Sequence, residues 1–460
     1  MPDPQAAALI NRLPPETLGE IFSFVPSQGI QLVQRNTYPW WLTFVCKLWR
    51  DVVILTPQLW ATIIVYLDPL RVSRIDTRGD SLVAAWQLCL ERSGDYPLTV
   101  TIESTSTDTM SFVQRLLLPL MKHARQWEKM IFGFPVHLLT PFVHNSSLRF
   151  PRLCDLMLRG GHHDTPSDLQ PPKHQLFPHA PVLSRVQFQE FLYPPSLLKI
   201  SWAQITELCL VWNDGNVWDL LEVLENTPNL ACLTFAKILD SWSTFHRAPR
   251  PRDSQALELP QLRRISWRTF SANHFRLFDM LSTPRLVEME FSVNDIDWQL
   301  DVMQRFLHRS RCTVVIARLN ISNPRLVESF LDVLPDAEEI TLTTTPGDVG
   351  LMHALTLGES TSTERIVPKM KKLVLENMPM KAEVHSAFVR MVQSRLPGPD
   401  SMKGQGQGSR LVSLDISVYP EEILADFSMA SAYQLLRETL PPEEMKLIKY
   451  EERRFEDRFR

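Results

Sequence analysis

The sequence contains one group of residues whose side chains could bind a metal ion. Cysteine, histidine and aspartate are common zinc ligands, but their spacings here match no zinc-binding pattern. The segment is also rich in proline, which favours a surface loop. We therefore predict no metal site and no other cofactor. The residues considered are Cys154, His162, His163, Asp164, His174 and His179.

The glycines near residue 404 are the only ones whose spacing could suggest a phosphate-binding loop. Gly404, Gly406 and Gly408 alternate within segment 397–409. A phosphate cradle needs a helix N-terminus after its glycines, whereas a strand is predicted here, so this segment is interpreted as a flexible insertion. The sequence also has no Gly-x-Ser-x-Gly motif, no P-loop and no carboxylate pair whose placement can be argued. We predict that the protein is not an enzyme.

The composition is that of a folded protein without a charge bias. Of 460 residues, 44% are hydrophobic, 48 are basic and 52 are acidic. Nucleic-acid binding needs a basic patch, which this even distribution does not provide. The uncharged run from Val52 to Leu67 is shorter than the ~20 residues that cross a bilayer, and it contains Pro57. We expect neither a nucleic acid nor a membrane as partner.

The cysteines and the start of the sequence bear on the compartment. The six cysteines are dispersed and form no C-x-x-C pair, which is typical of reduced, buried thiols. The start Met1-Pro2-Asp3-Pro4 has an acidic residue where a signal peptide has its basic region. We expect a chain without disulfides in the cytoplasm, the nucleus or both.

Residues 13 to 60 predict two short helices that need a partner surface. Pro14, Pro15 and Glu16 are typical of a helix start. A second helical run follows the turn residues 36–39, and we expect Phe44 and Leu48 to be core positions there. Helices this short are marginal in water by themselves, so a small helical subdomain packed on the rest of the chain is one interpretation. The apolar stripes are Leu18, Ile21, Phe22 and Val25, then Trp41, Phe44, Val45, Leu48, Trp49 and Val52.

This stretch resembles an F-box, the helical module that docks a protein on the Skp adaptor of cullin-RING ubiquitin ligases. Three pieces occur in the family's order: Leu-Pro-x-Glu at 13–16, Val-Cys-x-x-Trp-Arg at 45–50 and Pro-x-Leu-Trp at 57–60. Segments 86–102 and 123–127 are similar to a pattern of F-box proteins from mushroom-forming fungi. The resemblance implies a set of adaptor-binding residues, some of which can instead hold the module together. They are Leu13, Pro14, Leu18, Ile21, Phe22, Val45 and Trp49.

After the F-box, the pattern apolar-x-x-apolar-x-apolar recurs eleven times, at intervals of 21 to 41 residues. Amphipathic helical patterns, such as those at 217–224 and 326–333, lie between these strands. Strand and helix repeated in this way predict a solenoid that resembles a leucine-rich-repeat horseshoe, although the family's asparagine is mostly missing. A generic α/β domain with parallel strands is the alternative. The first positions are Trp127, Leu153, Leu183, Ile205, Leu230, Leu262, Leu286, Ile316, Ala337, Met370 and Leu411.

The predicted fold class is α/β, with an all-helical F-box followed by an irregular leucine-rich-repeat solenoid. The predicted parts are the F-box at 9–62, a linking segment at 63–125, the solenoid at 126–419 and a C-terminal helical cap at 420–460. The resemblance implies the substrate-recognition subunit of a Skp-cullin-F-box E3 ubiquitin ligase, which binds Skp, through it cullin, and an unknown protein substrate. The alternative is a non-ligase scaffold whose F-box-like helices pack on its own first repeat.

Overall fold

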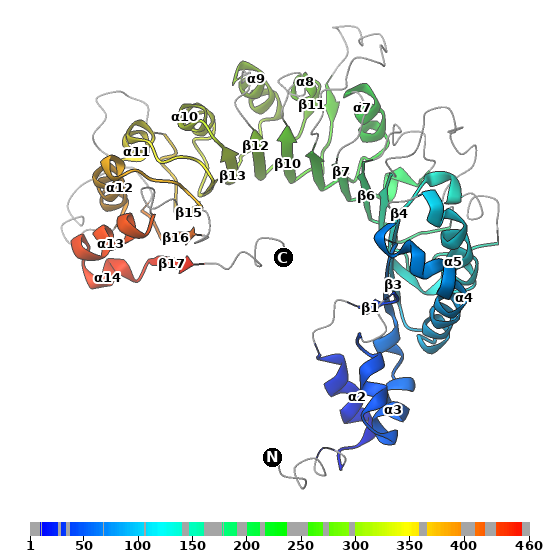
Figure 1. Ribbon diagram of the computed structural model, residues 1–460. Helices are drawn as coiled ribbons and strands as arrows, with labels where there is room; N and C mark the ends of the chain where they lie inside the picture. The colour runs from blue at the N-terminus through cyan, green and yellow to red at the C-terminus, as the bar shows by residue number, and fades with distance from the viewer. Residues whose placement is uncertain are drawn as a thin grey trace. The chain divides into compact units, whose positions relative to one another are not determined.

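The chain is α/β and forms two compact units, Met1–Thr227 and Pro228–Arg460, which are described one at a time. Twelve α-helices and a series of parallel strands make up the secondary structure of the described residues (Figure 1). The computed structural model describes residues 10, 12–25, 29–33, 37–67, 69–104, 107–139, 147–160, 177, 179–190, 200–211, 217–236, 256–269, 276–293, 300–357, 366–396, 410–418 and 429–452.

The N-terminal helices of the first unit begin where the sequence predicts. Helix α2 (Pro15–Ser23) has proline at its first position, where no backbone donor is lost. The second helical run is confirmed but divided, because Cys46 is extended between the 3₁₀ helix η1 (Trp40–Phe44) and helix α3 (Lys47–Ile54). The Cys46 sulfur caps α3 by accepting from the Trp49 backbone N–H at 3.5 Å. A further 3₁₀ turn, η2 (Pro57–Trp60), ends this part.

The division of the second helical run overturns one prediction. Phe44 is 74% exposed, so its predicted place in the core is wrong. The break at Cys46 shifts the helical phase, and the spacing of Phe44 to Leu48 no longer places the two side chains on one face. Leu48 is part-buried, and Val52 and Val53 of α3 are buried.

Seven parallel strands of the first unit pair in chain order. Two of them, with helices α4 (Pro69–Arg92) and α5 (Met110–Lys122), come from the segment predicted as a link, so the sheet begins before the predicted array. In Figure 1, α4 and α5 lie on one side of these strands. The strands are β1 (Ile30–Gln31), β2 (Thr62–Leu67), β3 (Leu98–Ser104), β4 (Trp127–Gly133), β5 (Asp155–Arg159), β6 (Arg185–Gln189) and β7 (Glu207–Val211). The other helical segments are η3 (Thr107–Thr109), η4 (Ala124–Gln126), η5 (Val136–Leu139), η8 (Trp202–Gln204) and α7 (Val217–Glu225).

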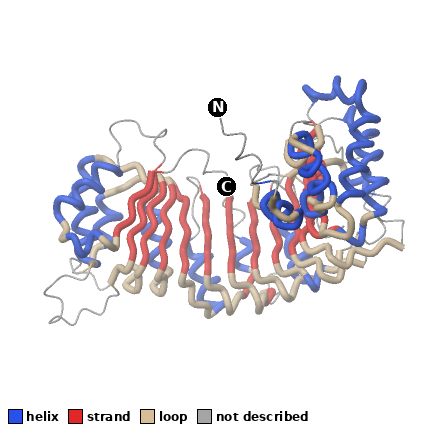
Figure 2. The backbone as a smooth tube through the Cα atoms, turned by 90° about the horizontal axis from the view of Figure 1, so that it is seen from below, coloured by secondary structure: helices blue, strands red, loops and turns tan. Residues whose placement is uncertain are grey.

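Eight strands of the second unit lie side by side, also in chain order and parallel. Its helices lie along one face of this sheet, and among the residues described here the other face carries none (Figure 1, Figure 2). The strands are β8 (Cys232–Ala236), β10 (Arg264–Thr269), β12 (Glu288–Val293), β13 (Ile316–Ile321), β14 (Glu339–Thr343), β15 (Lys372–Glu376), β16 (Ser413–Val418) and β17 (Ile448–Glu452). The helices are α8 (Arg276–Asp279), α9 (Leu300–Ser310), α10 (Pro324–Asp332), α11 (Val349–Leu355), α12 (Ala382–Arg395), α13 (Met429–Thr439) and α14 (Pro442–Met445). Strands β9 (Leu257–Glu258) and β11 (Leu281–Ser282) form a separate small pair.

The C-terminal segment combines helices with a strand. It is predicted to be helical, and α13 and α14 occupy part of it, but β17 then pairs with β16 and extends the sheet. The insertion 397–409 lies outside the described residues, as do four of the metal-ligand candidates: His162, His163, Asp164 and His174. Among the helices that the structure describes, none is both long and apolar enough to cross a lipid bilayer.

The apolar repeat fills the core between strands and helices, with one change of register. Ten of the eleven predicted triplets are buried throughout. At the eighth, Ala317 pairs with Met289 and Leu319 with Phe291, so the true triplet is Val314, Ala317 and Leu319. The predicted first position, Ile316, is part-buried on the opposite face. The prediction slipped by two residues because small Ala317 gives a weaker apolar signal than the isoleucines around it.

Candidate functional site

The N-terminal helices expose an unusual number of apolar side chains. Of thirteen large apolar side chains exposed among the described residues, six lie between Ile21 and Leu55. Phe24 is 83% exposed and Phe44 is 74% exposed. Exposed apolar groups scattered singly are ordinary, whereas a cluster on a small module marks an interaction surface. We name five of these residues the apolar patch: Ile21, Phe24, Trp41, Phe44 and Val45.

Tyr38 brings the two segments of the apolar patch together. Its hydroxyl donates a hydrogen bond to the Phe22 carbonyl, near the end of α2. Its ring lies 6.4 Å from that of Trp41, centroid to centroid, at the start of η1. Burial raises the pKa of Tyr38 to about 12, so the hydroxyl keeps its proton at neutral pH. The end of α2 and the start of η1 are therefore neighbours.

The side chains beneath the apolar patch form its support. Leu18 and Phe22 are buried, and the Phe22 ring lies 4.8 Å from that of Trp49. The Trp60 indole N–H donates to the Val53 carbonyl at 2.7 Å, which joins η2 to α3. These contacts pack α2 against α3 and join η2 to α3.

The structure divides the seven predicted adaptor-binding residues by exposure. Pro14, Ile21 and Val45 are exposed, while Leu13 and Trp49 are part-buried. The Trp49 Nε1 atom is buried and has no hydrogen-bond partner in the described part of the chain. The two that are buried, Leu18 and Phe22, belong to the support.

Three side chains of the apolar patch, Phe24, Trp41 and Phe44, are not among the predicted adaptor-binding residues, although Trp41 lies on a predicted apolar stripe. Phe24 follows Ile21 at helical spacing but is not a member of the predicted stripe, and Phe44 is predicted to be in the core. Apolar residues at the ends of short helices carry no periodic signal that separates an exposed position from a buried one. The exposure of Phe24 and Phe44 therefore needed the tertiary contacts.

The N-terminal helices also contact the first α/β repeat. The Arg92 guanidinium of α4 lies 4.5 Å from the Trp60 ring centroid and 5.7 Å from that of Trp40. The two indoles meet edge to face at 4.8 Å. Burial lowers the pKa of Arg92, and the two ring faces compensate part of its lost hydration. Packing on the first repeat thus uses Trp40 and Trp60 and leaves the apolar patch exposed.

The helix-free face of each sheet carries rows of alternating charge. Parallel strands place equivalent residues about 4.8 Å apart, so opposite charges attract across the row and like charges would repel. In the first unit, Asp155 lies 3.1 Å from Lys129 and 3.7 Å from Arg185, measured between charged atoms. Arg185 also reaches Glu207 at 2.6 Å. The row in the second unit comprises Arg264, Glu288, Glu339 and Lys372, and Arg318, two residues further along β13, reaches both Glu288 and Glu339.

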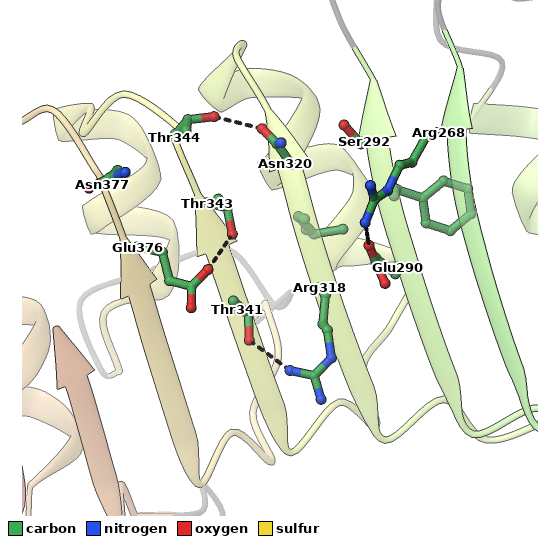
Figure 3. A pocket seen from close by; sticks show the side chains of 12 residues that line it. Arg268, Glu290, Ser292, Arg318, Asn320, Thr341, Thr343, Thr344, Glu376 and Asn377 are labelled. Carbon is green, nitrogen blue, oxygen red and sulfur yellow. Dashed lines mark hydrogen bonds and ion pairs between the residues drawn. The ribbon is translucent and has the colours of Figure 1, made fainter. Parts of the chain in front are cut away.

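A pocket of about 440 Å³ lies on this face in the second unit (Figure 3). We name it the strand pocket. Its polar side chains come from equivalent positions of β10, β12, β13, β14 and β15, and several are already hydrogen-bonded to one another. Thr344 Oγ1 lies 2.6 Å from Asn320 Oδ1, and Thr343 Oγ1 lies 3.1 Å from a Glu376 carboxylate oxygen. The lining residues are Arg268, Glu290, Phe291, Ser292, Arg318, Leu319, Asn320, Thr341, Thr343, Thr344, Glu376 and Asn377.

Two arginines hold the carboxylate of Glu290 in the strand pocket. The Glu290 carboxylate accepts from the Arg268 guanidinium at 3.0 Å and from the Arg264 guanidinium at 3.3 Å. Burial acts to raise the pKa of Glu290, but the hydrogen bonds and charges of the two arginines outweigh burial and hold that pKa below its usual value. The lining contains donors and acceptors but no histidine or cysteine, so it is suited to binding by hydrogen bonds and ion pairs.

No family model and no curated protein matches the chain. Among the residues that the structure describes, no three histidine, cysteine, aspartate or glutamate side chains are grouped so that they could hold a metal ion. The functional interpretation therefore depends on the apolar patch and the strand pocket.

Proposed function

We propose that the protein is the substrate-recognition subunit of a Skp-cullin-F-box E3 ubiquitin ligase in the cytoplasm or nucleus. Its N-terminal helices are an F-box that docks on the Skp adaptor, and its array is an irregular leucine-rich-repeat solenoid that holds a protein substrate. The protein contributes proximity to ubiquitin transfer, because holding a lysine near the activated ubiquitin raises the effective concentration without a catalytic group.

The observation that carries this proposal is the coincidence of the apolar patch with the F-box-like motif. The three motif pieces at 13–16, 45–50 and 57–60 lie at the start of α2, at α3 and at η2, in the same group of N-terminal helices that exposes Ile21, Phe24 and Phe44. A monomer rarely exposes this many large apolar side chains on so small a module. Covering them with a helical partner would be stabilised by the hydrophobic effect. Adaptor docking explains why these side chains remain exposed.

A scaffold without ligase function is the second candidate, and the Arg92 contact favours it. Arg92, Trp40 and Trp60 pack the N-terminal helices on the first repeat, as that alternative requires. The contact leaves the apolar patch uncovered, however, so intramolecular packing alone gives no reason for Phe24 and Phe44 to be apolar.

The adaptor proposal predicts a loss of binding when the apolar patch becomes charged. Replacing Phe24 and Phe44 together with aspartate should weaken binding to a purified fungal Skp adaptor at least 100-fold. Each buried aromatic ring contributes about 1.5–3 kcal/mol, and ~1.4 kcal/mol corresponds to a tenfold change in affinity. The melting temperature should change little, because both side chains are exposed in the free protein. Co-purification and melting curves of the variants measure both.

Leu118 of α5 provides the matched control, because it is an exposed apolar side chain outside the N-terminal helices. Leu118→Asp should retain the adaptor at wild-type strength. A second variant, Leu13→Ala with Pro14→Ala, tests the opening motif and should also bind the adaptor more weakly. Equal adaptor retention by wild type and by the Phe24 and Phe44 variant would favour the scaffold.

A further inference from the structure

The strand pocket has a polarity across the sheet. On the side of β10 to β13, the charged residues of the lining are Arg268, Arg318 and Glu290, with a sum of one positive charge. On the side of β14 and β15, the charged residue of the lining is Glu376. One side of the pocket is therefore positive and the other negative, while its sum is neutral.

Uncharged hydrogen-bonding groups fill the space between the two ends. Arg268, Ser292, Asn320, Thr343 and Glu376 occupy equivalent positions on consecutive strands, as the pairing of β10 with β12, β13, β14 and β15 requires. Figure 3 shows them in one row along the pocket, with Arg268 at one end and Glu376 toward the other. Four strand intervals separate the end residues, or about 19 Å at 4.8 Å each.

The lining excludes several classes of ligand. Phe291 is the only aromatic side chain of the lining and is fully buried, so no ring is exposed for a sugar or a base to stack on. Small-molecule pockets are mostly apolar and enclose their ligand. Here the Arg268 side chain is 59% exposed, and the other polar side chains of the lining are part-exposed apart from Thr341, which is buried. The neutral sum of charge does not favour a polyanion. An extended polypeptide fits a shallow, polar and bipolar row.

We propose that the strand pocket binds an extended segment of a protein that carries an acidic side chain and a basic side chain about 19 Å apart. Arg268 pairs with the acidic side chain and Glu376 with the basic one. Ser292, Asn320 and Thr343 hydrogen-bond to the polar groups between them. At about 3.4 Å per extended residue, the two charges are five or six residues apart. This inference deepens the proposed function, on which it rests for the identity of the segment as part of a substrate.

The experiment uses synthetic ten-residue peptides and the full chain without adaptor. Each peptide contains one aspartate and one lysine in a serine and asparagine background, with the two charges two to eight residues apart and in both orders. Fluorescence anisotropy should show the tightest binding at a separation of five or six residues. Affinity should also fall as the salt concentration rises, because the charged groups are solvent-accessible.

Neutral variants test the two contacts individually. Arg268→Gln should lower the affinity for the best peptide about fivefold. A second peptide has asparagine in place of the aspartate and cannot pair with Arg268. Wild type and Arg268→Gln should bind this second peptide with equal affinity. Glu376→Gln should likewise lower the affinity for the best peptide, and it should equal wild type in binding a peptide with glutamine in place of the lysine. Arg285→Gln is the control, since Arg285 is an exposed arginine of the second unit outside the pocket lining and should leave all peptides unchanged.

Two outcomes would overturn the inference: affinity that does not depend on charge separation, or affinity that Arg268→Gln and Glu376→Gln both leave unchanged. Because no adaptor is present, a failure here is distinct from a failure of adaptor docking. The Phe24 and Phe44 variant should bind the peptides as wild type does.

Discussion

Replacing Arg395 with methionine is expected to lower the free energy of unfolding by about 3–5 kcal/mol. Arg395 is fully buried, and its guanidinium donates to three carbonyls: Leu355 at 2.5 Å, Val367 at 3.3 Å and Ile366 at 3.3 Å. Burial lowers its pKa to about 10, so the side chain remains charged at neutral pH. Methionine fills similar space but leaves all three carbonyls without that donor, and each unsatisfied group is costly.

Arg390→Met is the control for this substitution, because Arg390 lies on the same helix and is exposed. Urea unfolding followed by tryptophan fluorescence should show a lower midpoint for Arg395→Met and an unchanged one for Arg390→Met. Equal midpoints for the two variants would mean that Arg395 does not hold the segments around Leu355 and Val367 to α12.

Replacing Leu373 with asparagine is expected to have a similar effect, about 3–5 kcal/mol of lost stability. Leu373 is fully buried in β15 and pairs with Ile340 on one side and Leu414 on the other. Asparagine removes apolar contacts and also buries an amide without partners, because the neighbouring strand residues offer no polar side chain there. The charged substitution Leu373→Asp should be more damaging still.

Val374 provides the matched control one residue further along. It is part-exposed on the opposite face of the same strand, between Thr341 and Asp415. Val374→Asn should change the unfolding midpoint only slightly, because asparagine can reach water or those polar neighbours. Similar losses from Leu373→Asn and Val374→Asn would contradict the assigned faces of β15.

The repeated core could be predicted from sequence because its signal is local. Apolar residues two apart point to the same face of a strand, and the pattern recurs after each helix. The pattern did not identify core positions correctly where a side chain is small or where the spacing of apolar residues changes. Ala317 was passed over, and β3 was missed because its apolar residues Leu98, Val100 and Ile102 alternate without the expected gap. The register between β3 and β4 also shifts by one residue after Leu98, where β4 has Glu128 as an extra residue.

The interaction surfaces could be predicted only in part. The motif pieces located the N-terminal helices, but exposure depends on which side chains the helices bury against each other, and this reversed the expectation for Phe44. The strand pocket depends on neighbours such as Arg268 and Glu290, or Asn320 and Thr344, that are more than twenty residues apart in the chain. Their polar positions follow no period that indicates which strands will be adjacent.

The most direct measurement of the central proposal is a calorimetric titration of the full chain with a purified fungal Skp adaptor. We expect binding with one adaptor per chain and a negative heat-capacity change, the sign that apolar surface is buried. The same titration with the Phe24→Asp and Phe44→Asp double variant should give little or no heat of binding. If the wild-type chain does not bind the adaptor, or if the double variant gives the wild-type isotherm, the apolar patch is not an adaptor surface and the ligase proposal is wrong.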